Sequence, residues 1–235
     1  MKIAFLTIAT YKYAAYAFNL IESLNKYAFT DTTHDISLIV CSDHNIVFDN
    51  NQRVKGHVQH ITHIPFPLIS LMRYHYYSNL ELILQEYDYV YHIDCDMQLN
   101  DVVSNEILSN TVCVEHPGFL GDISHEHLPF DRTTNSNAYV SFTSGKKYYQ
   151  NCFQGGKTSL FLKMCRELKH KIEEDLRNNY IALWHDESYM NRYMVDNPPD
   201  LVLPFVYAYP ELYDLGPIKK IIHLHKNHLE IRKTN

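Results

Sequence analysis

The 235-residue sequence contains only seven glycines, and no G-x-G-x-x-G or G-x-x-x-x-G-K-[ST] loop occurs among them. Because the backbone amides of such loops cradle phosphates, neither a dinucleotide site of that type nor a P-loop is predicted. The chain also lacks an apolar run of about 18 residues, the length that a transmembrane helix needs. Its first residues, MKIAFLTI, have one lysine and no small-residue cleavage site, so neither a signal peptide nor a membrane anchor is expected.

Cysteine pairs and excess positive charge are missing as well. The five cysteines are odd in number and form no C-x-x-C pair, which argues against a disulfide framework and favours a reducing compartment. The formal net charge of −6 makes nucleic acid an unfavourable partner, because like charges repel. These features predict a cytoplasmic protein. Peripheral association with the inner face of the membrane is compatible with this prediction.

Strands and helices alternate along the first half of the chain. Apolar runs predict strands at 2–8, 36–42 and 87–93, and an alternating run predicts another at 57–63. Apolar residues at helical spacing predict helices at 12–29, 70–86 and 158–178, and a further helix from near Asp186 to the prolines after 197. This order predicts a mostly parallel sheet flanked by helices, with ligands at the carboxyl ends of its strands.

Two carboxylates, Asp94 and Asp96, directly follow the predicted strand 87–93. Residues i and i+2 of an extended strand point to the same side, so both side chains can contact one ion. A hard divalent cation such as Mn²⁺ or Mg²⁺ prefers oxygen ligands and can bridge them to a diphosphate. The alternative is that both carboxylates face solvent in a turn, and the D-x-D pattern by itself does not decide between the two.

Three other stretches favour a site at this edge of the sheet. WHDES (184–188) lies at a predicted helix start, where Asp186 can cap the helix and bind a ligand at once. HPGF (116–119) places a histidine beside a rigid Pro-Gly turn, and HKNHLEIR (225–232) brings Lys226 and Arg232 close to the C-terminus. A solvated tail is the ordinary interpretation of the last stretch, but basic side chains can also close over a diphosphate.

Taken in order, DCD, HPGF, WHDES and KNH followed by Arg232 resemble glycosyltransferase family 6, which includes the blood-group A and B transferases, the α-1,3-galactosyltransferase and bacterial relatives. The resemblance extends from about Thr7 to Arg232, and WHDES together with HPGF is its specific part. It implies one α/β domain over 1–235 with the A-type glycosyltransferase fold, a nucleotide-binding half at about 1–97 and an acceptor-binding half with the tail at about 98–235. The implied reaction is a retaining α-1,3 transfer of galactose or N-acetylgalactosamine from a UDP-sugar to a galactose-terminated glycan or glycolipid, with or without fucose.

The resemblance also implies roles for individual positions. Asp94 and Asp96 match the pair that binds Mn²⁺ or Mg²⁺, and Tyr13 matches an aromatic residue that stacks on uracil. Asp186 matches a residue that holds the sugar hydroxyls, and Glu187 matches the catalytic carboxylate below the anomeric carbon. The remaining donor-binding positions are Ile8, Thr10, Arg73, Gln150, Asn151, Cys152, Lys226 and Arg232, and the acceptor-binding positions are His116, Trp184, Glu187 and Glu211.

The segment that selects the donor sugar departs from the family pattern. Cys152 is bulkier than glycine or alanine, so volume favours galactose, whereas the amides of Gln150 and Asn151 can hydrogen-bond an N-acetyl group. Many bacterial members carry asparagines at the acidic pair and need no metal. This chain keeps Asp94 and Asp96, so metal dependence is expected.

The chemistry of such a transfer explains why these residue types are needed. A cation on the acidic pair, together with Lys226 and Arg232, would stabilise the leaving diphosphate. Glu187 would stabilise the oxocarbenium-like sugar as a nucleophile or as a charged partner, and both a covalent intermediate and front-face attack stay open. Basic residues with few apolar anchors predict that the tail, 226–235, orders when the donor binds.

Two further classes of function stay open: a UDP-sugar-binding or glycan-binding module that has lost catalysis, and a metal-dependent hydrolase of phosphate esters. The two acidic pairs argue against the first, and the small number of carboxylate and histidine ligands argues against the second. A structural role is favoured for His223 and His225 over binding of the metal. His125 and His127 form another H-x-H pair, for which no third zinc ligand is evident.

Overall fold

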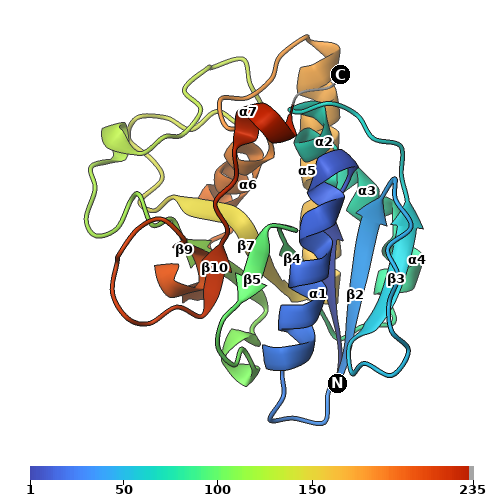
Figure 1. Ribbon diagram of the computed structural model, residues 1–235. Coiled ribbons are helices and arrows are strands. Elements are labelled where there is room, and N and C mark those ends of the chain that lie inside the picture. Colours follow the sequence, from blue (N-terminus) through green and yellow to red (C-terminus); the bar gives the residue numbers. More distant parts are fainter. Residues whose placement is uncertain (233–235) are drawn as a thin grey trace.

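A seven-stranded sheet forms the centre of the computed structural model, which describes residues 1–232 (Figure 1). Its strands lie in the order β3-β2-β1-β4-β7-β6-β8, and β7 alone among them runs antiparallel to both of its neighbours. The prediction of a mostly parallel sheet flanked by helices is therefore confirmed. The strands are β1 (Lys2–Ile8), β2 (Asp35–Ser42), β3 (Lys55–His60), β4 (Tyr89–Ile93), β6 (Thr111–Glu115), β7 (Tyr149–Lys157) and β8 (Leu201–Leu203).

A second, three-stranded sheet brings the C-terminal part of the chain to the end of β4. It has the order β5-β10-β9, formed by β5 (Met97–Leu99), β10 (Ile221–His223) and β9 (Tyr209–Pro210). His223 pairs with Met97, and the N–H of Leu224 donates to the carbonyl of Asp96 over 2.9 Å. This pairing sets the last strand beside the turn that carries the acidic pair.

The strands of the sheet send alternate side chains into two hydrophobic cores, as their period of two requires. Phe5 packs in the core under α1 (Tyr16–Tyr27), and Leu6 packs in the core on the other face, formed with α3 (Arg73–Asn79), α5 (Thr158–Arg177) and α6 (His185–Asp196). The remaining helices are α2 (Leu68–Leu71), α4 (Glu81–Leu84) and α7 (His228–Ile231), with 3₁₀ turns at Tyr11–Ala15, Asn105–Ile107, His125–His127 and Phe205–Ala208.

The single helix predicted over 70–86 is wrong, because the segment forms the three short helices α2, α3 and α4. Four of its buried apolar residues, Leu71, Tyr74, Tyr77 and Leu80, are spaced by three residues rather than 3.6. Such a spacing stays on one face only if the chain tightens between turns. The N–H of Leu80 accordingly donates to the carbonyl of Tyr77, three residues earlier. The breaks place Arg73 at the start of α3, facing the end of the sheet.

The other predicted elements occur with shifted ends. The first helix begins as a 3₁₀ turn before α1, and the alternating run at 57–63 forms a strand that ends at His60. All five cysteines are buried and free, in agreement with the absence of a disulfide framework. None of the helices within residues 1–232 is both long enough and apolar enough to span a bilayer.

Candidate functional site

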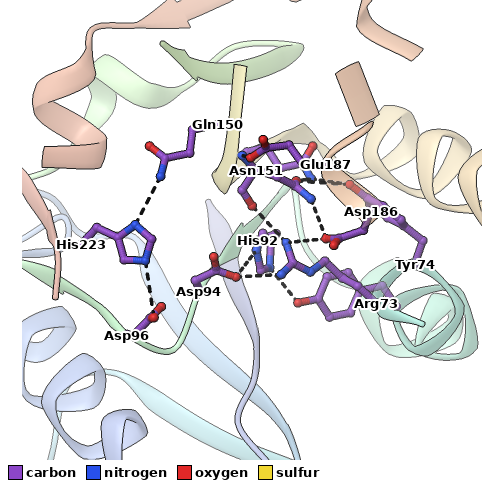
Figure 2. A network of polar contacts seen from close by, with 12 residues as sticks. Arg73, Tyr74, His92, Asp94, Asp96, Gln150, Asn151, Asp186, Glu187 and His223 are labelled. Carbon is purple, nitrogen blue, oxygen red and sulfur yellow. Dashed lines mark hydrogen bonds and ion pairs between the residues drawn. The ribbon is translucent and has the colours of Figure 1, made fainter. Parts of the chain in front are cut away.

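Two adjoining cavities lie where β1 and β4 end, and Ser70, Arg73 and Asp94 line both of them. Figure 2 shows the polar network around them, in which Arg73 and Asp94 lie between Asp96 and Asp186. The first cavity is lined by Ile8, Thr10, Tyr13, Phe66, Ile69, Ser70, Arg73, Asp94, Cys95, Asp96, Lys226 and Arg232. The second is lined by Ser70, Arg73, Asp94, Gln150, Asn151, Cys152, Trp184, Asp186, Glu187 and His223.

Arg73 connects the two acidic pairs. One of its terminal nitrogens donates to Oδ1 of Asp94 over 2.8 Å, and the other donates to the carbonyl of Asn151 over 3.0 Å and lies 3.2 Å from Oδ2 of Asp186. The residue is 8% exposed. Burial disfavours its charge, but Asp186 and Asp94 outweigh that cost and raise the pKa of the guanidinium. Arg73 is therefore a permanent buried cation that the surrounding carboxylates stabilise.

Asp94 is held in its ionised form by two donors. Its Oδ1 also lies 3.1 Å from Nε2 of His92, whose Nδ1 lies 2.8 Å from the hydroxyl of Tyr77. Burial opposes ionisation of Asp94, yet the Arg73 guanidinium outweighs it and holds the pKa of Asp94 well below its usual range. Burial and Arg73 lower the pKa of His92 to about 4, so the imidazole is neutral at pH 7 and can donate one N–H to Asp94. Sequence analysis missed His92, although its i, i+2 spacing from Asp94 is visible in the strand pattern.

The acidic pair lies in a turn and not on the strand, which corrects the predicted alternation. β4 ends at Ile93, and the N–H of Met97 donates to the carbonyl of Asp94 over 3.0 Å to close the turn. The alternative of two solvent-facing carboxylates is also wrong for Asp96, which is 2% exposed. Both side chains line the first cavity, and their ligand atoms lie within 4.8 Å of each other.

A group with the composition of a cation site surrounds Asp96. Asp94, Asp96 and His223 each offer one ligand atom, and these atoms lie within 4.8 Å of one another. Nε2 of His223 lies 3.4 Å from Oδ2 of Asp96 and 3.2 Å from Nζ of Lys226, which also forms an ion pair with Asp96. An ammonium group thus already lies among these donors, and two carboxylates with one imidazole suit Mn²⁺. The structural role favoured for His223 from sequence does not account for this position.

The second acidic pair lies in the first turn of α6, where Asp186 is buried and Glu187 is half-buried. Oδ2 of Asp186 accepts the side-chain N–H of Asn151 over 2.7 Å, and Oε2 of Glu187 accepts the backbone N–H of Asn151 over 3.0 Å. Burial raises the pKa of Asp186 to about 6 and that of Glu187 to about 7. The expected N-cap role of Asp186 is wrong, because the cap position belongs to Trp184 and the helix begins at His185.

The polar side chains at the start of β7 form hydrogen bonds with other residues of the protein. The carbonyl oxygen of the Asn151 amide accepts from Gln154 and from the Tyr74 hydroxyl, while its N–H₂ is bound to Asp186. The Gln150 amide lies 3.3 Å from Nδ1 of His223. Cys152 is 2% exposed and contributes to the wall of the second cavity.

The described part of the C-terminal tail covers the first cavity. Asn227 caps α7, and Nζ of Lys12 donates to the carbonyl of Glu230 over 3.0 Å. The guanidinium of Arg232 lies 3.6 Å from the centre of the Phe66 ring. Residues 233–235, the end of the tail that was expected to order with the donor, lie outside the described residues.

Three predicted acceptor-binding residues lie nearer the surface. Trp184 is 49% exposed at the rim of the second cavity. His116 and Glu211 line neither cavity; His116 packs against the ring of Phe119 at 4.8 Å, and burial lowers its pKa to about 4. Glu211 accepts the backbone N–H of His225 over 2.6 Å, which places it beside the strand that carries His223.

The sheet, the acidic turn at the end of β4 and the acidic first turn of α6 together define a glycosyltransferase of the A-type fold. The chain belongs to glycosyltransferase family 6, whose family model matches residues 2–233. It is 34% identical over 163 residues to the O-antigen biosynthesis glycosyltransferase WbnI of Escherichia coli, covering 67% of each chain.

Mammalian relatives match over a similar number of residues. The chain is 33% identical over 151 residues to the histo-blood group ABO system transferase 2 of Rattus norvegicus, which covers 63% of this chain and 45% of the relative. It is 28% identical over 138 residues to the globoside alpha-1,3-N-acetylgalactosaminyltransferase 1 of Homo sapiens, covering 59% of this chain and 40% of the relative. The matched part thus spans less than half the length of these mammalian proteins.

Proposed function

We propose that the chain is a retaining α-1,3-glycosyltransferase that moves galactose or N-acetylgalactosamine from a UDP-sugar to a galactose-terminated glycan or glycolipid. One observation carries the proposal: the buried Arg73 lies between Asp94, which belongs to a group suited to a cation, and Asp186, which precedes a glutamate whose pKa burial raises to about 7. A transferase needs both, because charge of opposite sign develops on the leaving diphosphate and on the sugar. The family of the chain and the names of its relatives support this reaction class.

In this proposal the first cavity binds the nucleotide. Tyr13 stacks on uracil, and Ile8 and Thr10 line the base pocket. Lys226 and Arg232 contact the diphosphate from the tail, where basic side chains form strong charge-assisted hydrogen bonds with phosphate oxygens. Residues 1–97 then form most of the nucleotide-binding half, while residues 98–235 supply the acceptor side and the tail.

Mn²⁺ or Mg²⁺ is the proposed cofactor, and Asp94 and Asp96 would hold it. When bound, the ion supplies positive charge that stabilises the leaving diphosphate. Arg73 and His92 keep Asp94 ionised for this task. Asp96 is buried against Lys226, and that ammonium can move to the diphosphate when the ion takes its place beside the carboxylate.

The sugar lies in the second cavity in this proposal, with Asp186 on its hydroxyls and Glu187 below the anomeric carbon. Burial makes the ionised form of Glu187 costly, so a developing positive charge on the sugar recovers that cost in the transition state. The carboxylate acts either as a nucleophile or as a charged partner of an ion-pair intermediate. Trp184, His116 and Glu211 form the acceptor side.

Galactose is the favoured donor sugar. Cys152 fills space that an acetamide would need, and both ends of the Asn151 amide already have partners inside the protein. An N-acetyl group would therefore contact Cys152 without gaining a hydrogen bond from Asn151, and the misfit would cost ~1–3 kcal/mol, or roughly 10- to 200-fold in selectivity. The name of the Escherichia coli relative favours a bacterial surface polysaccharide as the acceptor. In this proposal the polysaccharide is assembled at the cytoplasmic side of the envelope.

A direct assay separates this proposal from its alternative, a UDP-sugar-binding or glycan-binding module without catalysis. The protein is incubated with Mn²⁺, UDP-galactose or UDP-N-acetylgalactosamine, and galactose-terminated acceptors with and without fucose. We expect an α-1,3-linked product, identified by NMR, with a higher kcat/KM for UDP-galactose. UDP-sugar binding without any product from either donor would favour the module, and a faster reaction with UDP-N-acetylgalactosamine would contradict the volume argument at Cys152.

A further inference from the structure

His223 lies between two groups that fix which of its ring nitrogens carries a proton. Figure 2 shows the ring with Gln150 on one side and Asp96 on the other. Nδ1 of His223 lies 3.3 Å from the Gln150 amide, and Nε2 lies 3.2 Å from Nζ of Lys226 and 3.4 Å from Oδ2 of Asp96. An ammonium group can only donate, so the nitrogen that faces Lys226 accepts. The neutral ring then carries its proton on Nδ1 and keeps a lone pair on Nε2.

The Gln150 amide completes this arrangement. Its Oε1 is buried and has no hydrogen-bond partner among the described residues. The oxygen and nitrogen of an amide side chain differ by a half-turn, and their assignment follows the hydrogen-bond network. With Oε1 turned toward His223, the Nδ1–H of the ring donates to it. That turn gives the oxygen a donor and the ring proton an acceptor, and it places the amide N–H₂ where Oε1 had been.

We propose that His223 is a third protein ligand of the cation, through Nε2, and that Gln150 is the positioning residue that holds its ring for this task. The inference rests on the metal site in the proposed function, and it goes beyond the two aspartates. A metal-binding histidine needs a free lone pair on one nitrogen and a hydrogen-bond acceptor for the other. His223 has both, and its Nε2 lies within 4.8 Å of the carboxylate ligand atoms.

Two further observations support a cation at this place. The Lys226 ammonium already lies against Asp96 and Nε2 of His223, so the donors are arranged around a positive charge. The antiparallel pairing of His223 with Met97, next to Asp96 in the chain, fixes the ring on the side of the acidic turn. The position of His223 therefore comes from the sheet and does not depend on the described tail beyond it.

The test measures coordination directly, with MnCl₂ and UDP as probes and without turnover. Electron spin echo spectroscopy of bound Mn²⁺ detects the nitrogen of a ligated imidazole, and labelling only the histidines with ¹⁵N assigns it. We expect a ¹⁴N coupling in the wild-type protein, its loss in His223→Ala, and its retention in His225→Ala. His225 is the matched control because it is an exposed histidine two residues away.

The role of Gln150 is tested by the affinity for Mn²⁺ in the presence of UDP, measured by calorimetry. Gln150→Leu removes the acceptor and should weaken binding about 10- to 100-fold, the range seen when a metal ligand loses its supporting partner. Gln150→Glu keeps an acceptor and should restore both affinity and coupling. Equal melting temperatures of the variants would show that the fold is unchanged.

Each outcome separates this inference from the proposed function. Bound Mn²⁺ without a histidine coupling in the wild-type protein overturns the role of His223 and leaves the aspartate site standing. Equal affinities of Gln150→Leu and the wild type overturn the role of Gln150. A protein that transfers sugar at full rate in EDTA overturns the metal site, and this inference with it.

Discussion

The two acidic pairs of this protein use the same functional group in opposite electrostatic environments. Asp94 accepts hydrogen bonds from Arg73 and His92, and its pKa lies well below the usual range. Glu187 is half-buried and forms no ion pair with the described residues, and burial raises its pKa to about 7. The first carboxylate is thus prepared to hold a positive ion at any physiological pH. The second is a costly anion that a positive charge on a neighbouring group would stabilise.

The largest effect is expected on the cation side. Asp96→Ala should reduce transfer about 10³-fold or more, because it removes a ligand of the ion that stabilises the leaving group. The measurement is the initial rate with Mn²⁺, with circular dichroism to establish that the fold is intact. Asp101→Ala is the matched control, since that carboxylate is exposed and pairs with Lys220 away from both cavities. Full activity in EDTA would contradict the expectation.

Glu187→Gln should reduce transfer by about 10²- to 10³-fold while UDP binding stays unchanged. The amide keeps the shape and the hydrogen bond from Asn151 but loses the charge that stabilises the sugar cation. Single-turnover rates measure the loss, and Glu174→Gln, an exposed glutamate on α5, serves as the control. A variant that keeps a tenth of the wild-type rate would mean that this carboxylate does not stabilise the transition state.

The same substitution should make the protein more stable at high pH. Burial raises the pKa of Glu187 from 4.5 to about 7, so between these values the folded state holds a proton that the unfolded chain has released. The free energy of unfolding therefore falls as the pH rises from about 4.5 to 7, and the loss stays constant above that range. Glu187→Gln should remove this loss and raise the free energy of unfolding at pH 8 by on the order of 2 kcal/mol.

Urea denaturation at pH 8 and at pH 4 measures that difference. At pH 4 both the folded and the unfolded wild-type protein carry a protonated Glu187, so the substitution should change little there. An equal effect at the two pH values would show that packing, and not charge, decides the result.

The smallest effect is expected from the tail. Truncation after His225 removes Lys226 and Arg232 from the first cavity, and it should weaken UDP binding about tenfold through the lost charge-assisted hydrogen bonds. Leu229 is 79% exposed, so few apolar contacts are lost and the melting temperature should barely change. Calorimetry and a thermal melt on the same samples measure both quantities. A large fall in melting temperature would mean that the tail is part of the core.

Short motifs drew attention to residues that the fold brings together, whereas they described the backbone around them less well. DCD and WHDES contain the two acidic pairs, and Arg73 lies between Asp94 of the first pair and Asp186 of the second. The break at Met72 was missed, since it lies between short helices of which α3 packs against α5. A local pattern of apolar residues cannot show such tertiary contacts.

The contacts between the motifs could not be predicted from the sequence either. Arg73 joins Asp94 to Asp186, which lies 113 positions further along the chain, and no spacing rule relates them. His223 was assigned a structural role because isolated histidines usually have one. Its place beside Asp96 comes from strand pairing between β5 and β10, which follows from the fold and not from the tail sequence.

The central claim is that the first acidic pair holds the cation and the second stabilises the sugar. The most direct test measures UDP binding by calorimetry, with and without Mn²⁺, in the variants Asp96→Asn and Glu187→Gln. We predict that Asp96→Asn loses the gain in UDP affinity that Mn²⁺ gives to the wild-type protein, whereas Glu187→Gln keeps that gain in full although it no longer transfers sugar. If Asp96→Asn retains the Mn²⁺-dependent gain, or Glu187→Gln loses it, the two acidic pairs do not have the separate tasks assigned to them.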